Sequence, residues 1–232
     1  MIIGITGQPP AGSGKDTVAD FLVKEYGFVS VAFADPMKRI CADVFGWDKE
    51  VLWGSSEKRN EPDKRFKRPL SEWHEAVVKG LQVPRELVLT PEMSYLTPRY
   101  ALQRLGQEWA RDCYADTWVD YGMRVIKKVL AGEAVYTAVG GLDYDLTGYT
   151  GKPTGIVIPD VRYNNEAKAI READGRVWLV QRPGAGLKGE AAKHASEVGV
   201  SEENIDFCIK NNKGFDWLYQ QVQTLMSNQP TI

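Results

Sequence analysis

Short apolar runs alternate with amphipathic segments along most of the chain. Apolar runs suited to buried strands cover residues 1–6, 29–33, 155–159, 176–181 and 205–209. Spacing typical of helices marks residues 16–25, 35–45, 99–111, 116–130, 167–172 and 215–226. Because strands and helices alternate, we expect an α/β fold with a mainly parallel sheet and helices on both faces.

Two of the predicted helices carry large apolar side chains, which either pack in the core or line a pocket. In the helix over 99–111, Leu102, Leu105 and Trp109 share one face at helical spacing. The helix over 116–130 has Trp118 at its start. A tryptophan there either packs in the core, which is the commoner fate, or forms one wall of a pocket for a base.

Three stretches interrupt the alternating pattern. Residues 48–95 are rich in cations and prolines, and we interpret them as an inserted subdomain with little core of its own. Residues 132–155 are rich in glycine, tyrosine and threonine, which is typical of a hairpin or loop. Residues 184–200 form a glycine- and alanine-rich connector that we interpret as a lid. The chain is otherwise expected to be a single domain over 1–232.

The first predicted strand leads through a glycine-rich loop into a helix. Gly-Gln-Pro-Pro-Ala-Gly-Ser-Gly-Lys occupies residues 7–15, and this layout is typical of a phosphate-binding P-loop. Backbone N–H groups of such a loop line a concave nest, and the helix N-terminus adds partial positive charge. Lys15 would add a mobile point charge.

The loop departs from the usual P-loop spacing. Pro9 stands where the first glycine of the motif belongs, and Asp16 replaces the Ser or Thr that normally touches magnesium. Thr17 offers a hydroxyl one residue later. A plain glycine-rich turn is the alternative interpretation, although Gly-Ser-Gly-Lys between a strand and a helix favours phosphate binding.

Composition narrows the function classes. The chain of 232 residues has 43% hydrophobic residues and a formal net charge of -2, and its pI is near 5.8. These values argue against a nucleic-acid coat or a membrane-surface protein. No apolar run reaches the length of a membrane span, and we expect no signal peptide. The three cysteines and two histidines lack metal-ligand spacing, so we expect reduced thiols and a cytoplasmic location.

Charged side chains stand at places where open α/β sheets bind ligands. Asp160 and Arg162 follow a predicted strand directly, although a structural ion pair would explain them too. Lys38 falls in the first turn of its helix, an unfavourable place for a cation unless an anion lies nearby. The run over 57–68 is densely basic and suggests an anionic partner, while a solvated charge run is the alternative.

With these motifs in view, the sequence resembles the deoxynucleoside monophosphate kinase family, which is typically encoded by bacteriophages. The resemblance runs along nearly the whole chain. It rests on Ser-Gly-Lys-Asp-Thr at 13–17, Phe-Ala-Asp-Pro-Met-Lys at 33–38, Leu-Gln-Arg-Leu-Gly at 102–106, Trp118, Asp-Val-Arg-Tyr-Asn-Asn-Glu-Ala at 160–167, His-Ala-Ser-Glu at 194–197 and the turn at Asn211. Gln107 departs from the family, in which threonine is frequent at that position.

The resemblance implies a P-loop kinase core of three layers. It also implies transfer of the γ-phosphoryl group of ATP, with Mg²⁺, to the 5′-phosphate of a deoxynucleoside monophosphate. Lys15, Asp16 and Arg162 are the implied catalytic residues. Residues implied for ATP are Gly12, Ser13, Gly14, Lys15, Asp16, Thr17 and Arg182, with Asp16 or Thr17 toward the metal. Residues implied for the acceptor are Lys38, Arg59, Arg65, Arg99, Gln103, Gly106, Trp118, Asp160 and Glu166, and Lys193 is implied in the lid.

Two other readings stay open at this point. A kinase of the same architecture that acts on dephospho-coenzyme A or phosphomevalonate would share the loop. A non-catalytic nucleotide-binding protein would share it as well, but would need no second basic site. The sequence leaves the accepted bases open, and an exposed apolar helix face could support a homodimer.

Overall fold

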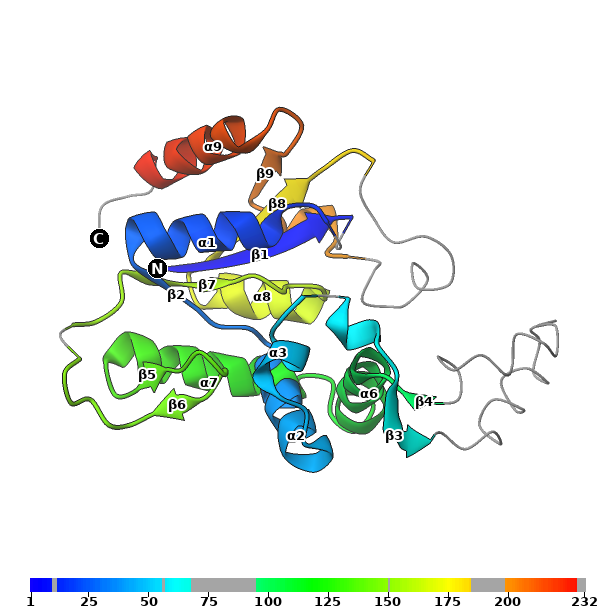
Figure 1. Cartoon of the computed structure of the whole chain (residues 1–232). Helices are drawn as coiled ribbons and strands as arrows, with labels where there is room; N and C mark the ends of the chain where they lie inside the picture. The colour runs from blue at the N-terminus through cyan, green and yellow to red at the C-terminus, as the bar shows by residue number, and fades with distance from the viewer. Residues whose placement is uncertain (10–11, 56, 68–94, 150, 185–198, 229–232) are drawn as a thin grey trace. The chain divides into compact units, whose positions relative to one another are not determined.

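The computed structural model describes residues 1–9, 12–55, 57–67, 95–149, 151–184 and 199–228 (Figure 1). These residues form two compact units. Unit 1 combines Met1–Asp35 with Asp116–Ile232, and unit 2 is Pro36–Ala115. Most of the proposed lid and most of the insertion over 48–95 lie outside the described residues, and so do Lys193 and both histidines.

Unit 1 is built on a five-stranded sheet in which every pairing is parallel. Its strands are β1 (Ile2–Gln8), β2 (Phe28–Ser30), β7 (Gly155–Ile158), β8 (Arg176–Gln181) and β9 (Phe207–Lys210). Their order across the sheet is β2-β7-β1-β8-β9, so β1 lies at the centre. The predicted α/β class with a mainly parallel sheet is confirmed.

Helices cover both faces of this sheet (Figure 1). On one face, α1 (Lys15–Tyr26) and α9 (Phe215–Ser227) pack buried residues such as Leu22 and Leu218 against β1 and β8. On the other face, α7 (Thr117–Ala131) and α8 (Asn164–Glu172) contribute Ile126 and Ile170 to a second core. The central strand is therefore buried on both sides, which fixes the start of the glycine loop on a rigid base.

Several boundaries in unit 1 differ from the sequence prediction. The first strand extends beyond residue 6, because Gly7 and Gln8 pair with Val180 and Gln181 of β8. The second strand ends at Ser30 instead of Phe33: the Val31 N–H still donates to the Val157 carbonyl of β7, but the N–H groups of Phe33 and Ala34 donate to the Asp160 carboxylate.

The helix predicted over 167–172 begins three residues earlier, at Asn164. The Glu166 carboxylate accepts hydrogen bonds from the N–H groups of Arg162 (2.7 Å) and Tyr163 (3.1 Å). Glu166 thus satisfies donors that the start of a helix leaves without acceptors. The prediction for 132–155 is confirmed as a small hairpin of β5 (Val135–Tyr136) and β6 (Leu142–Asp143).

Unit 2 has a core of its own. It contains most of α2 (Asp35–Phe45), α3 (Lys49–Leu52), η1 (Lys58–Asn60), β3 (Asp63–Lys67), β4 (Tyr95–Leu96), α6 (Pro98–Arg104) and the π-helix η3 (Leu105–Arg111). Phe45, Trp47 and Phe66 pack as an aromatic group beside buried Leu52. Of the buried residues of this core only Leu52 lies within 48–95, while Cys41, Trp47 and Ala101 lie outside it, so the expectation of little core in 48–95 stays a prediction.

The helix predicted over 99–111 changes type at Leu105. After α6, the segment η3 has the wider turn of a π-helix, with the N–H of Asp112 bonded to the Gln107 carbonyl. Each wider turn rotates the following side chains relative to an α-helix. Trp109 is consequently 64% exposed, whereas Ala110 is buried and Leu102 and Leu105 pack on the core, so the prediction that Trp109 shares the face of the two leucines was wrong.

One further chain element completes unit 1, the short helix η6 (Glu202–Asn204). Its Asn204 is buried and donates from Nδ2 to the Asn164 side chain at the start of α8. In the part of the chain that the structure describes, no helix has both the length and the apolar character needed to cross a membrane.

Candidate phosphate-binding site

The glycine loop lies between the centre of the sheet and the start of α1. Gly12 and Gly14 have positive φ angles of 76° and 96°, in the left-handed region that favours glycine. The first helical hydrogen bond runs from the N–H of Val18 to the Gly14 carbonyl. The loop therefore leads directly into a helix N-terminus. There the N–H groups that have no acceptor within the helix, together with the helix dipole, favour an anion.

Lys15 and Asp16 stand together at the first turn of α1. The Lys15 ammonium lies 2.7 Å from Asp16 Oδ1. The Lys15 side chain is only 14% exposed, whereas that of Asp16 is 79% exposed. An aspartate beside the lysine keeps a hard oxygen ligand at the loop, while the lysine keeps the positive charge that a phosphate requires.

Thr17 has different surroundings from Asp16. It lines a surface hollow with Asp20, Phe21 and Lys24 of α1 and with Tyr219 of α9, whose ring stacks on Phe21 at 4.3 Å. Because successive residues of an α-helix are rotated by about 100°, Asp16 and Thr17 do not share one direction. These surroundings favour Asp16 over Thr17 as the metal-side residue.

A contact from the far end of the chain reaches the loop. The Asn211 side-chain amide donates to the Ser13 carbonyl at 2.8 Å. Arg182, predicted for ATP, makes a longer contact of 3.4 Å from Nη1 to the Gly12 carbonyl. Sequence reasoning noted the turn at Asn211 but assigned the residue no role, because local pattern carries no information on a contact across 198 positions.

Asp160 lies at the end of β7, the strand next to β1. The N–H of Val161 donates to the Ile5 carbonyl of β1. The Asp160 carboxylate accepts from the N–H groups of Phe33 (3.0 Å) and Ala34 (2.9 Å). Since α1 and α8 cover opposite faces, the carboxyl ends of β1 and β7 flank the point where open α/β sheets bind ligands. Through these two hydrogen bonds, Asp160 holds the chain that follows β2 beside that point.

The other residues predicted in unit 1 are placed near the same end of β7. Arg162 is half-buried and donates its N–H to Glu166, which is itself only 3% exposed. Trp118 is 5% exposed at the start of α7. The neighbouring Asp116 side chain accepts from Asn165 of α8 at 2.7 Å, which joins the starts of α7 and α8.

In unit 2, the predicted acceptor cations make several contacts within the unit. The Lys38 ammonium lies 5.5 Å from the centre of the Trp53 ring. Arg59 donates from Nη1 to the carbonyls of Leu52 (3.1 Å) and Gly54 (2.8 Å). Arg99 donates from Nε to the Asn60 side chain, which links α6 to η1.

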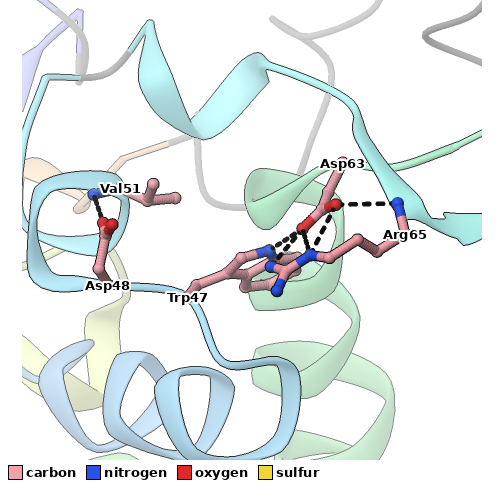
Figure 2. Close-up of polar contacts among 5 residues, drawn as sticks. All are labelled: Trp47, Asp48, Val51, Asp63 and Arg65. Atoms are coloured by element: carbon pink, nitrogen blue, oxygen red, sulfur yellow. Dashed lines mark hydrogen bonds and ion pairs between the residues drawn. The ribbon is translucent and has the colours of Figure 1, made fainter.

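Arg65 pairs with a carboxylate of its own strand, as Figure 2 shows. Its Nη2 lies 2.7 Å from Asp63 Oδ2, and its Nε lies 3.1 Å from both carboxylate oxygens. Asp63 also accepts from the Trp47 indole N–H at 2.7 Å. The hydrogen bonds from the Arg65 side chain hold the pKa of Asp63 well below its ordinary value. This pairing competes with the predicted role of Arg65 in binding a phosphate.

Gln103 and Gly106 lie near the junction of α6 and η3. Gln103 is half-buried, and Gly106 is buried. A Cβ at position 106 would come within 2.8 Å of the Met37 sulfur, so the two segments approach as closely as they do because residue 106 is glycine. This packing explains Gly106 without any ligand contact.

Among the described residues, no group of three or more His, Cys, Asp or Glu side chains could hold a metal ion. Mg²⁺ is usually bound by one or two carboxylates together with the phosphates of a nucleotide. The exposed Asp16 carboxylate at the loop is the kind of oxygen donor that fits such a shared site.

The fold and the loop define an α/β protein with a strand–loop–helix arrangement of the kind that is typical of P-loops. No family model matches the chain. A curated relative from Acanthamoeba polyphaga mimivirus, named "Putative deoxynucleotide monophosphate kinase", is 29% identical over 229 residues, which is 98% of this chain and 97% of that protein. The resemblance to deoxynucleoside monophosphate kinases is thereby confirmed along the whole chain.

Two solved structures were also compared. The Thermus thermophilus protein TT1252 is 14% identical, with 100% of this chain and 98% of that chain covered and a TM-score of 0.46. The dephospho-CoA kinase of Campylobacter jejuni is 15% identical, with 97% and 95% covered and a TM-score of 0.37. Because both TM-scores lie below 0.5, the fold is assigned from the sheet topology itself.

Proposed function

We propose that this protein is a kinase that transfers the γ-phosphoryl group of ATP to the 5′-phosphate of a deoxynucleoside monophosphate. The products would be ADP and a deoxynucleoside diphosphate. The observation that carries the proposal is the glycine loop that joins the central strand to α1, with Lys15 in the first turn. The name of the mimivirus relative supports the choice of acceptor.

Phosphoryl transfer needs positioning and positive charge more than covalent chemistry. Gly12, Ser13 and Gly14 would offer backbone N–H groups to the phosphates of ATP, and the α1 N-terminus would add partial positive charge. Lys15 would neutralise the charge that develops on the transferred group. Arg182 would approach the same phosphates, since its guanidinium already lies beside the Gly12 carbonyl.

Magnesium fits the residues at this loop. We assign Asp16 to hold the ion, directly or through a bound water, with the Thr17 hydroxyl as the alternative. When bound to ATP, Mg²⁺ would neutralise charge on the phosphate oxygens and orient them. The pairing of Asp16 with Lys15 would keep both side chains close to the bound phosphates.

For the acceptor, we propose that cations of unit 2 bind the 5′-phosphate. Lys38 and Arg99 are the first candidates. Arg59, which binds backbone carbonyls, and Arg65, which pairs with the Asp63 carboxylate, are the further candidates. Gln103 and Trp118 are proposed for the base and sugar.

The remaining predicted residues fit roles in positioning. Gly106 is explained by its approach to Met37, and Asp160 and Glu166 by their hydrogen bonds to backbone N–H groups. Arg162 stays the proposed catalytic arginine, because its backbone is fixed by Glu166 beside the end of β7.

An assay of ADP release tests the proposal and separates it from its competitors. Purified protein with ATP and Mg²⁺ is supplied in turn with the eight common nucleoside monophosphates, dephospho-coenzyme A and phosphomevalonate. We expect ADP release with one or more deoxynucleoside monophosphates. Release with dephospho-coenzyme A or phosphomevalonate alone would replace the proposed acceptor, and release with none of these compounds would contradict the proposal.

A further inference from the structure

The carbonyl of Ser13 has a partner that comes from outside the loop. Asn211 follows β9 directly, and its Nδ2 donates to this carbonyl at 2.8 Å. The same Nδ2 would lie only 2.4 Å from a Cβ at position 14. Asn211 therefore touches the loop at two consecutive residues, and glycine at position 14 makes room for it.

The backbone of Asn211 is itself held in place. Its backbone N–H donates to the Gln181 carbonyl at the end of β8, at 2.8 Å. The N–H of Arg182 in turn donates to the Gln8 carbonyl at the end of β1, at 3.1 Å. These bonds join the carboxyl ends of β9, β8 and β1, so Asn211 is anchored to the same sheet as the loop that it contacts.

A bond to the Ser13 carbonyl also constrains the next N–H group. In a planar trans peptide the carbonyl and the following N–H point in opposite directions. Fixing the Ser13 carbonyl toward Asn211 consequently fixes the Gly14 N–H away from Asn211. At a φ of 96°, Gly14 lacks the backbone restriction that a Cβ would impose, so the contact from Asn211 adds a restriction that the residue itself does not provide.

We propose that Asn211 is a positioning residue for the nucleotide. By holding the Ser13 carbonyl, Asn211 directs the Gly14 N–H toward the side of the loop on which the phosphates of ATP bind. This inference rests on the proposed function and adds a residue from the opposite end of the chain to the ATP site. It assigns Asn211 to binding of ATP and to no part of acceptor binding.

Two variants at Asn211 and one matched control test the inference. Asn211→Ala removes the donor, and Asn211→Asp keeps the shape but opposes two oxygen atoms. Asn212→Asp makes the same chemical change at the next residue, whose side chain is exposed. Calorimetry gives the Kd for ATP, steady-state kinetics gives KM for both substrates, and thermal unfolding without ligand verifies that each variant is folded.

We expect Asn211→Ala to raise the Kd and KM for ATP about tenfold, the loss that corresponds to one hydrogen bond. Asn211→Asp should raise them further, and Asn212→Asp should change them less than about twofold. The KM for the deoxynucleoside monophosphate should stay unchanged in every variant.

Two results would overturn the inference while leaving the proposed function intact. One is wild-type affinity for ATP in Asn211→Ala. The other is an equal rise in KM for both substrates, which indicates a general structural role. A wild-type protein that binds no ATP would overturn the proposed function itself, and the role of Asn211 with it.

Discussion

A single buried carboxylate, that of Glu166, sets where α8 begins. It accepts hydrogen bonds from two backbone N–H groups, and only 3% of the residue is exposed. The Asp160 carboxylate likewise accepts hydrogen bonds from two backbone N–H groups in the chain that follows β2. At the residue scale, both carboxylates that the sequence suggested for a substrate pocket hold backbone that surrounds the end of β7.

Replacing Glu166 tests this structural role. Glu166→Ala leaves two backbone donors near the protein interior without acceptors, and it is expected to lower the free energy of unfolding by about 2 kcal/mol. Glu172→Ala, at the exposed end of the same helix, is the matched control and should leave stability nearly unchanged. Urea unfolding measures both. Loss of activity at unchanged stability in Glu166→Ala would instead favour contact with the substrate.

The two candidates for the metal, Asp16 and Thr17, are distinguished by how their replacement changes the Mg²⁺ concentration that activity requires. Asp16→Asn should raise the Mg²⁺ concentration for half-maximal activity about 10- to 100-fold, as loss of an oxygen that orients a metal or its water does. Thr17→Val, which keeps the shape of the side chain, should leave it unchanged. Activity measured over a Mg²⁺ series decides between them, and the reverse result would assign the metal to Thr17.

At the scale of elements, the strand β3 is held to Trp47 through Asp63 (Figure 2). The hydrogen bonds from Arg65 keep the pKa of Asp63 below its ordinary 3.8. Because the pKa of Asp63 is lower in the folded protein, its ionised carboxylate stabilises the fold at pH values above the ordinary pKa. That stability is lost as the pH falls toward the lower pKa.

Urea unfolding of the wild type and Asp63→Asn over a pH series measures this effect. The stability advantage of the wild type is expected to be constant between about pH 5 and pH 7 and to shrink below about pH 3.8. An advantage that grows as the solution becomes more acidic would contradict the pairing of Asp63 with Arg65.

The exposure of Trp109 in the π-helix η3 predicts how its replacement changes stability. Trp109→Ala should change the free energy of unfolding by less than about 0.5 kcal/mol, because the side chain is largely exposed. Trp118→Ala, at a 5% exposed position, should cost about 3 kcal/mol or more. Chemical unfolding of both variants gives the comparison. A large loss for Trp109→Ala would indicate that the α-helical register continues beyond Leu105.

The elements that sequence pattern predicted well are those with a sustained period. The strand over 176–181 matches β8, and the predicted helix over 215–226 ends within one residue of α9. The pattern failed where a side chain replaces a backbone partner, as Asp160 and Glu166 do. It failed again at η3, because a helical period of 3.6 was assumed where the turn is wider. The Asn211 contact with Ser13 depends on tertiary structure and has no local signal.

At the scale of the whole molecule, the strand order gives the glycine loop its support. The central strand β1 is paired on both edges, to β7 and β8, and covered by helices on both faces. Contacts from Asn211 and Arg182 then reach the loop from the C-terminal half of unit 1. The proposed phosphate-binding loop is therefore contacted by segments from both halves of the chain.

Transfer of label from [γ-³²P]ATP to a deoxynucleoside monophosphate, by the wild type and by Lys15→Met, tests the central claim most directly. Lys24→Met, at the exposed end of α1, is the matched control. We predict labelled deoxynucleoside diphosphate from the wild type and Lys24→Met, and a value of kcat/KM lower by about 10²–10³ in Lys15→Met, which stays folded. No labelled diphosphate from the wild type with any deoxynucleoside monophosphate, or equal transfer by Lys15→Met and Lys24→Met, would contradict the account.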